Sequence, residues 1–303
     1  FTIGVLLRGV VGVVVTYFIQ PWLPGLSFSV ESFKSVLKFG IPYQTNTFLA
    51  MIKDDGMTMF LGSTLGASGI GLLGWAQKWA YAPLRFFMDQ VIKVTFPAFS
   101  RLQNDKKELS NAVSKSIFFI CLLVFPSLIL LVLLVPSLTQ IIPKYQKWSP
   151  ALLALSLISI TSAFAGVTTP LTNMLNAIGK ISLTFKFMVM WTALTWIFVP
   201  LFSFVYGING AAFGFSLVGI SSIVALIRAK EFIDINYIQV AGKPLLGALI
   251  IGAYVFALIN LLPSNFVSII FIGISSIISY IGLMFIIEPS LLQLVKNILN
   301  HKK

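Results

Sequence analysis

Helix-length apolar runs fill this chain of 303 residues almost from end to end. A bilayer core is crossed by about 20 apolar residues in a helix. Runs of that length lie at approximately 2–20, 41–63, 71–98, 116–142, 150–177, 182–205, 208–228, 244–262 and 266–287. Only 10% of the residues are charged and the mean hydropathy is +0.95, whereas soluble domains are about 25% charged. The sequence therefore predicts an all-α polytopic membrane protein with about nine transmembrane helices.

The basic residues indicate how these helices are oriented. The net charge is +12, but the bases do not form a patch with interleaved aromatic residues, so nucleic acid is not an expected partner. If the link 21–40 is cytoplasmic, alternation places fourteen of the 21 Lys and Arg residues on that side and only Lys144 and Lys147 outside. This is the positive-inside pattern. It predicts a multi-pass protein of the inner (cytoplasmic) membrane with a cytoplasmic C-terminus.

Four charged residues share one face of the third run. At 100° per residue, Lys78, Arg85, Asp89 and Lys93 fall within an arc of roughly 80°. A charge at the centre of a span costs about 2.5–3.5 kcal/mol on insertion scales, so this face is not expected to meet lipid. We expect it to line a water-filled cationic cavity, with Asp89 pairing with Arg85. In the alternative interpretation, the two lysines snorkel to opposite interfaces and leave a structural Arg85–Asp89 pair.

The second run carries Lys53, Asp54 and Asp55 near its middle. Successive residues of a helix point in different directions, so we expect only one or two of the three to face the cavity. A buried carboxylate beside a base could also bind H⁺ or Na⁺ as a coupling ion. The alternative is an interhelical salt-bridge cluster that fixes packing. Arg8 in the first run is a candidate to complete the basic lining.

The fifth run carries a polar stripe that spans roughly 100° of the helix. Its members are Ser159, Ser162, Gly166, Thr169, Asn173 and Asn176. Their hydroxyl and amide groups suit a polar cavity wall for sugars, and they suit interhelical hydrogen bonds equally well. In the seventh run, Gly210 and Gly214 form a GxxxG pattern that predicts close helix packing. Pro126, Pro136 and Pro170 predict kinks or broken helix ends.

The residues of familiar enzyme sites are scarce. The chain has one Cys, Cys121, and one His, His301, which excludes a disulfide framework, HExxH and cysteine-rich metal sites. There is no GxSxG and no Walker A motif, and no link exceeds roughly 20 residues. We therefore expect no enzyme activity, no cofactor and no metal.

Several short motifs resemble those of one family of membrane proteins. The segments Lys38–Pro42, Lys53–Asp55 and Phe60–Gly62, with Gly66 and Gly69, are similar to the start of the second half of Wzx-type polysaccharide flippases. Phe96–Asp105 and Leu175–Lys180 resemble two further recurring pieces, in the same order. This family belongs to the MOP exporter superfamily, together with the MATE transporters and the lipid II flippase MurJ.

The resemblance implies a fold of twelve to fourteen helices in two lobes, of which these would be the last nine. Residues 1–20 would then be the last helix of the N-terminal lobe and 21–40 a cytoplasmic inter-lobe link. Residues 41–230 would form a six-helix C-terminal lobe, and 231–303 an appended helix pair with a cytoplasmic tail. The chain would thus be a fragment that lacks most of the N-terminal lobe.

The function that the resemblance implies is the flipping of undecaprenyl-pyrophosphate-linked oligosaccharide across the membrane by alternating access. Arg85 is the first candidate for the pyrophosphate, followed by Lys78, Lys53, Lys93 and Arg8, because guanidinium and ammonium groups bind phosphate oxygens. Expected partners are the lipid-linked oligosaccharide, the bilayer, a coupling ion, and a polysaccharide polymerase with other assembly proteins.

Other functional classes remain open at this stage. A MATE-like exporter of small cations would need an acidic or aromatic cavity, whereas the spans contain five basic residues and only three aspartates. A membrane polymerase or glycosyltransferase would be expected to carry a large or acidic outer loop, and the outer links here are short. A purely structural subunit would not need charges aligned on one helix face.

Overall fold

The computed structural model describes residues 2–21 and 28–293, and every element in these ranges is helical. The chain divides into two compact units, residues 1–45 and 46–303, which are described separately. The first contains α1 (Thr2–Ile19) and most of α2 (Val30–Met51). The C-terminal tail from residue 294, predicted to be cytoplasmic, and residues 22–27 of the predicted link lie outside the described ranges.

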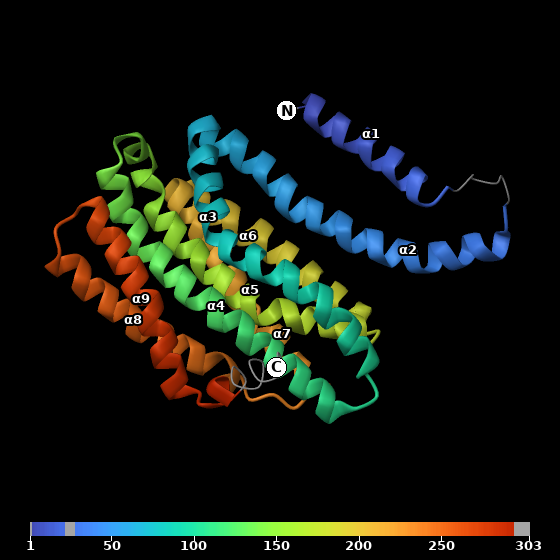
Figure 1. Cartoon of the computed structure of the whole chain (residues 1–303). Helices are drawn as coiled ribbons and strands as arrows, with labels where there is room; N and C mark the ends of the chain where they lie inside the picture. Colours follow the sequence, from blue (N-terminus) through green and yellow to red (C-terminus); the bar gives the residue numbers. More distant parts are fainter. Residues whose placement is uncertain (1, 22–27, 294–303) are drawn as a thin grey trace. The chain divides into compact units, whose positions relative to one another are not determined.

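The second unit contains the remaining helices (Figure 1). In chain order they are the π-helix η1 (Ile52–Gly56), α3 (Met57–Arg101), α4 (Lys106–Ile141), the 3-10 helix η2 (Pro143–Ala151), α5 (Leu152–Ala177), α6 (Ile181–Ser221), α7 (Ile223–Ala229), the π-helix η3 (Ile238–Gly242), α8 (Lys243–Leu261) and α9 (Phe266–Ile287).

Local sequence explains where several of these helices begin and end. The Asp105 side chain accepts hydrogen bonds from the backbone N–H groups of Lys107 and Glu108, both at 3.0 Å, and so caps the start of α4. The turn after α5 contains Gly179 at φ +76°, a left-handed conformation that favours glycine, and the N–H of Lys180 donates to the Leu175 carbonyl at 2.7 Å. The family-like segment Leu175–Lys180 is thus a helix C-terminal turn.

The described residues contain six helices that are long and apolar enough to cross a membrane, compared with the nine runs expected. Two of the six are longer than one crossing requires, at 55 and 49 residues, and each is kinked at a glycine of positive φ, Gly66 (+70°) or Gly207 (+57°). These kinks lie where the sequence predicts outer links. Helix α1 is not among the six.

Helix α6 folds back on itself at Gly207. A Cβ atom built on Gly210 would lie 1.9 Å from the Phe202 carbonyl oxygen, and one on Gly214 would lie 2.8 Å from the Cα of Val199. Such contacts between residues 15 apart require two helices packed side by side, because a straight helix would separate them by about 22 Å. The GxxxG pattern therefore serves the close packing that the sequence predicts.

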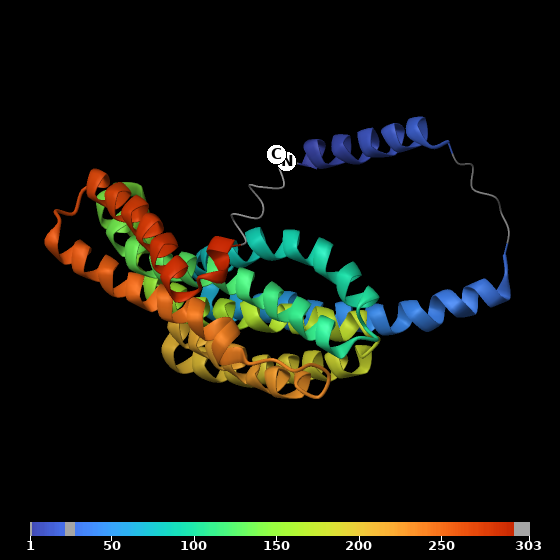
Figure 2. The same cartoon turned by 60° about the horizontal axis from the view of Figure 1, so that its bottom comes forward.

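Helix α5 lies at the centre of the second unit and packs against α3, α4 and α6, while α4 also packs against α8 and α9. Figure 1 and Figure 2 show the turns at 142–152 and 262–265 at one end of this unit and the turns at 102–105 and 178–180 at the other. The links predicted to be outer and cytoplasmic are thus separated along the bundle. Which end faces the cytoplasm stays a prediction, as do the boundaries of the four predicted domains.

Prolines do not end the helices in which they lie. Helix α4 continues through Pro126 and Pro136, and α5 continues through Pro170, with helical backbone angles on both sides. The helices are therefore not broken at these prolines, and the alternative expectation, a kink, stays a prediction. Neighbouring helices in a packed bundle can stabilise a proline-containing helix, which explains why they are tolerated.

Candidate functional site

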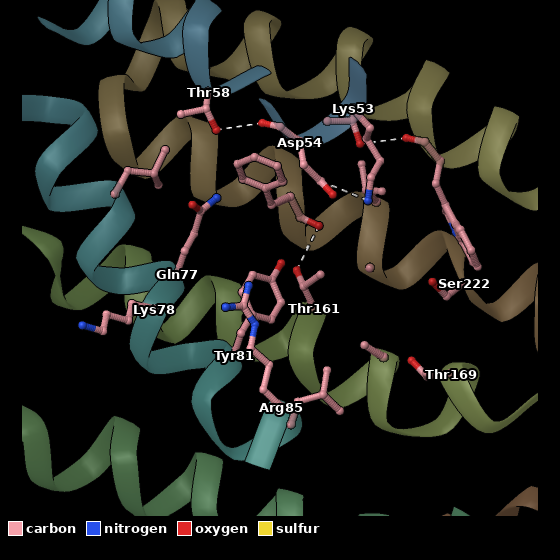
Figure 3. A pocket seen from close by; sticks show the side chains of 18 of the residues that line it. Lys53, Asp54, Thr58, Gln77, Lys78, Tyr81, Arg85, Thr161, Thr169 and Ser222 are labelled. Atoms are coloured by element: carbon pink, nitrogen blue, oxygen red, sulfur yellow. Dashed lines mark hydrogen bonds and ion pairs between the residues drawn. The ribbon is translucent and has the colours of Figure 1, made fainter. Parts of the chain in front are cut away.

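The second unit contains an open cavity of about 630 Å³, which is lined by η1, α3, α5 and α6. Its volume lies within the range of about 300–1,000 Å³ that is typical of small-molecule sites. The polar and charged residues of its lining are Lys53, Asp54, Thr58, Gln77, Lys78, Tyr81, Arg85, Thr161, Thr168, Thr169, Thr172, Trp191, Thr195 and Ser222. Figure 3 shows the lining from close by.

The π-helix η1 brings two adjacent charged residues to this cavity. Lys53 and Asp54 both line it, with the Lys53 Nζ 3.1 Å from a carboxylate oxygen of Asp54, whereas Asp55 is not in the lining. A π-turn takes one residue more than an α-turn, so neighbouring side chains diverge less. The expectation that one or two of the three face the cavity agrees with this arrangement, but nothing in the sequence pattern indicates the π-helix.

Trp196 of α6 contacts this π-helix from the side. Its indole Nε1 donates to the Ile52 carbonyl at 3.3 Å. A Cβ on Gly56 would lie 3.2 Å from the ring of Trp196, so the absence of a side chain at Gly56 allows the close approach. Thr58 donates to the Asp54 carbonyl at 2.7 Å. The irregular backbone is therefore held by a second helix as well as by its own chain.

Helix α3 contributes the second group of charges. In Figure 3 the side chain of Arg85 extends beside Tyr81, and both residues line the cavity. The Tyr81 hydroxyl lies within electrostatic range of both Asp54 and Arg85. Lys78 is in the lining, but Figure 3 shows its amine directed away from Arg85. Both Lys78 and Arg85 are exposed, so water reaches this part of the cavity.

Two of the four charges predicted on this face do not reach the cavity. Asp89 and Lys93 are exposed and are not in the lining, and the ion pairs of the described residues do not include one between Arg85 and Asp89. Side chains on a helix lean toward its N-terminus, which directs Arg85 toward Tyr81 rather than toward Asp89. Residues four positions apart on a helix also differ in direction by about 40°, so Lys93, eight residues after Arg85, points about 80° away from it.

On α5 the cavity is lined by the stripe next to the predicted one. Thr161, Ala165, Thr168, Thr169 and Thr172 line the cavity, and of these the sequence singled out Thr169 alone. The predicted stripe is rotated by roughly a quarter turn from the observed one. Both stripes are polar, so periodicity could not choose between them.

The other members of the predicted stripe face neighbouring helices or their own backbone. Ser159 donates to the Leu155 carbonyl at 2.8 Å, and Asn176 accepts from the Thr184 hydroxyl at 2.7 Å. The Ser162 Oγ and the Asn173 Nδ2 are buried without a hydrogen-bond partner among the described residues. None of these four residues lines the cavity. The interhelical interpretation therefore suits Asn176, and the cavity interpretation suits Thr169.

The sequence does not predict the cavity wall formed by α6. Trp191, Thr195 and Ser222 line the cavity from this helix and its C-terminal end. The Trp191 Nε1 is buried and has no hydrogen-bond partner in the described part of the chain. Helix α6 carries no charged residue after Lys186, and its polar residues are sparse, so its sequence offers no periodic signal.

Arg8 belongs to the first unit, where its side chain is exposed on α1. The described residues contain no group of three or more His, Cys, Asp or Glu that could hold a metal ion.

The cavity lining carries three cationic side chains, Lys53, Lys78 and Arg85, and one carboxylate, Asp54. A net positive lining with hydroxyl groups on the facing helices can bind an anionic, hydroxyl-bearing molecule.

Known proteins resemble the chain in sequence. A family model described as "Polysaccharide biosynthesis protein" matches residues 1–153. The lipopolysaccharide biosynthesis protein WzxC of Escherichia coli (strain K12) is 26% identical over 221 residues, which are 71% of this chain and 44% of WzxC. An uncharacterized membrane protein in the cps region of Klebsiella pneumoniae is 27% identical over 189 residues, or 61% of this chain and 38% of that protein. The chain thus spans less than half the length of these relatives.

A solved structure has the same fold. The lipid II flippase MurJ, in its inward closed conformation, aligns with a TM-score of 0.73 over 88% of this chain and 57% of MurJ, at 18% sequence identity. At that identity the likeness describes the fold alone. Because the family model covers half of the sequence, the chain belongs to the polysaccharide biosynthesis protein family, and the resemblance to Wzx proteins that its motifs predict is confirmed by WzxC.

Proposed function

We propose that this protein flips undecaprenyl-pyrophosphate-linked oligosaccharide units across the cytoplasmic membrane by alternating access, for the synthesis of a surface polysaccharide. The observation that carries the proposal is the cavity within the helix bundle, where Lys53, Lys78 and Arg85 outnumber Asp54. A pyrophosphate headgroup is anionic and accepts hydrogen bonds, which Arg and Lys supply. WzxC and MurJ, a biosynthesis protein and a flippase by name, support a lipid-linked cargo.

The same cavity disfavours the rival transport function. A small cation needs negative or aromatic groups in its binding site; Tyr81, Trp191 and Phe215 do line this cavity, but Lys53, Lys78 and Arg85 line it too and repel such a cargo. Here the single carboxylate of the lining, Asp54, is already paired with Lys53 at 3.1 Å. Asp54, Asp55 and Asp89 remain candidates for coupling to H⁺ or Na⁺, with Asp54 the first because it lies in the cavity wall. A polysaccharide polymerase and other assembly proteins remain proposed partners.

The proposal is tested by replacing Arg85 with Ala, and separately with Lys, in the intact protein of cells whose surface polysaccharide depends on it. We expect Arg85→Ala to lower surface polymer at least about tenfold, since a charge-assisted hydrogen bond contributes about 1.5–3 kcal/mol. Lipid-linked precursor should accumulate in the inner leaflet, and Arg85→Lys should restore part of the export.

Lys93→Ala is the matched control, because Lys93 is a cation of the same helix that is not in the cavity lining. It should export normally. Protein levels are measured in parallel by immunoblotting. Normal export by Arg85→Ala at normal protein levels would contradict the proposed role of the cavity.

A further inference from the structure

The cavity has two chemically different walls. Its charged residues all lie on η1 and α3. The wall formed by α5 and α6 is uncharged and contains Thr161, Thr168, Thr169, Thr172, Trp191, Thr195 and Ser222. In Figure 3, Thr169 and Ser222 lie across the cavity from Gln77 and Lys78. A ligand that fills the cavity therefore meets charge on one side and a mixture of neutral polar and apolar groups on the other.

Most hydroxyl protons of the uncharged wall are already engaged by the backbone. Thr161 donates to the Phe215 carbonyl at 3.0 Å and Thr195 to the Trp191 carbonyl at 2.7 Å. Thr168 and Thr172 each donate to a carbonyl of α5 at 3.0 Å. A hydroxyl has one proton and two lone pairs, so these four side chains offer mainly acceptor oxygens to a ligand.

Trp191 adds one unused donor to this wall. Its Nε1 is buried without a partner among the described residues, and leaving such a group unpaired costs about 1–3 kcal/mol. The Nε1 is closed off from solvent, so a ligand oxygen in the cavity that Trp191 lines reaches this N–H only when the indole ring turns toward it. The indole ring also presents an apolar face, to which the C–H groups of a sugar ring are complementary.

Phosphate oxygens and sugar hydroxyls have different requirements. Each phosphate of a diphosphate diester carries one negative charge and only accepts hydrogen bonds, so it gains little from the four threonine oxygens whose protons are already engaged. A sugar hydroxyl both donates and accepts, and it can satisfy the threonine oxygens and the Trp191 N–H together. We infer that the α5–α6 wall is a sugar-binding subsite, with Trp191 as a contact residue, and that it orients the headgroup with its phosphates toward η1 and α3.

This inference rests on the proposed function, and its test separates the two. Reporter thiols are introduced singly in the intact, detergent-purified protein after replacement of the one native cysteine, as Cys121→Ala. Thr169→Cys reports on the uncharged wall. Tyr81→Cys reports on the charged wall, because Tyr81 lines this wall beside Arg85. Protection from a water-soluble thiol reagent is measured with inorganic pyrophosphate, and with the neutral oligosaccharide released from the cell's own lipid-linked precursor.

We expect the oligosaccharide to protect position 169 and pyrophosphate to protect position 81. Trp191→Phe keeps an aromatic ring, although a smaller one, and removes the N–H; it should weaken protection by the oligosaccharide about threefold to tenfold, the effect of one hydrogen bond. Protection by pyrophosphate should not change. Trp79→Phe is the control, because Trp79 is exposed and is not part of the cavity lining.

The contrary outcomes are distinct. Protection of position 169 by pyrophosphate, or unchanged protection by the oligosaccharide in Trp191→Phe, would overturn the sugar subsite while leaving the proposed function intact. If neither pyrophosphate nor the oligosaccharide protects position 81 or position 169, both the subsite and the proposed function are contradicted.

Discussion

At the scale of single residues, glycines determine how closely this bundle packs. A Cβ on Gly219 would lie 2.7 Å from the Cα of Thr161, and one on Gly252 would lie 2.9 Å from the Ile129 side chain. Without a strong hydrophobic force between helices in lipid, such close approach is what allows van der Waals contact and interhelical hydrogen bonds. Gly219 and Thr161 both line the cavity, so this packing also fixes the position of its wall.

The sharpest test of this packing is Gly210→Ala. The added Cβ would meet the Phe202 carbonyl oxygen, a backbone atom that cannot move aside as a flexible side chain can. Overpacking costs about 1–3 kcal/mol or more, so we expect a lower unfolding temperature in detergent and less protein in the membrane. The matched control is Gly71→Ala, where the Cβ would meet no atom within 4 Å and helix propensity favours alanine. Equal unfolding temperatures for the two variants would contradict the hairpin at Gly207.

At the scale of elements, the positions of the long helices are easier to predict from the sequence than the face that each helix turns toward the cavity. Apolar runs and polar breaks mark the helices because every backbone polar group in a bilayer core must be paired within the helix. The charged residues Lys53 and Arg85 were found because charge in a span is costly. The threonine stripe of α5 and Trp191 of α6 were not found, since hydroxyl and indole groups are inexpensive in a span and occur on packed faces as well.

The π-helix η1 is the element on which the charged wall most depends, and Trp196 is its external support. Trp196→Phe removes the 3.3 Å hydrogen bond to the Ile52 carbonyl, a loss of about 0.5–1.5 kcal/mol, while keeping most of the ring. We expect the backbone of η1 to shift toward an ordinary α-helix. Asp54 would then turn out of the cavity.

Reporter thiols at positions 54 and 55 measure this shift in the Cys121→Ala background. With Trp196 present, a charged water-soluble reagent should label position 54 faster than position 55, because only position 54 lines the cavity. In Trp196→Phe the two rates should converge, whereas Trp79→Phe should keep the difference. An unchanged ratio of rates in Trp196→Phe would show that the π-helix does not depend on this tryptophan.

At the scale of the whole molecule, the charge asymmetry makes a prediction about orientation in the membrane. The turn at 102–105 is flanked by Arg101, Lys106 and Lys107, and the positive-inside pattern assigns it to the cytoplasm. The segment η2 lies at the opposite end of the bundle and is assigned to the outside. There Trp148 stacks on Trp75 at 5.3 Å, as expected of aromatic residues near an interface.

A matched pair of glutamines tests the assignment, since Gln103 and Gln146 are both exposed and lie at opposite ends. In intact cells, an impermeant thiol reagent should label Gln146→Cys and should label Gln103→Cys only after permeabilisation. Cys121 is buried, so the native thiol should contribute little background. The reverse pattern of labelling would invert the proposed direction of transport.

The π-helix has one further consequence, which concerns insertions and deletions. A π-turn is equivalent to one extra residue within an otherwise regular helix. Removing a single residue from 52–56 would restore α-helical spacing and would leave the segments on either side facing much as they do now, because five residues of a π-turn and four of an α-helix cover nearly the same rotation. The helix would survive, whereas neighbouring side chains would again diverge by about 100°, and Lys53 and Asp54 would no longer both face the cavity. A deletion of one residue within 52–56 is therefore expected to preserve the fold and to remove one of these two charges from the cavity wall.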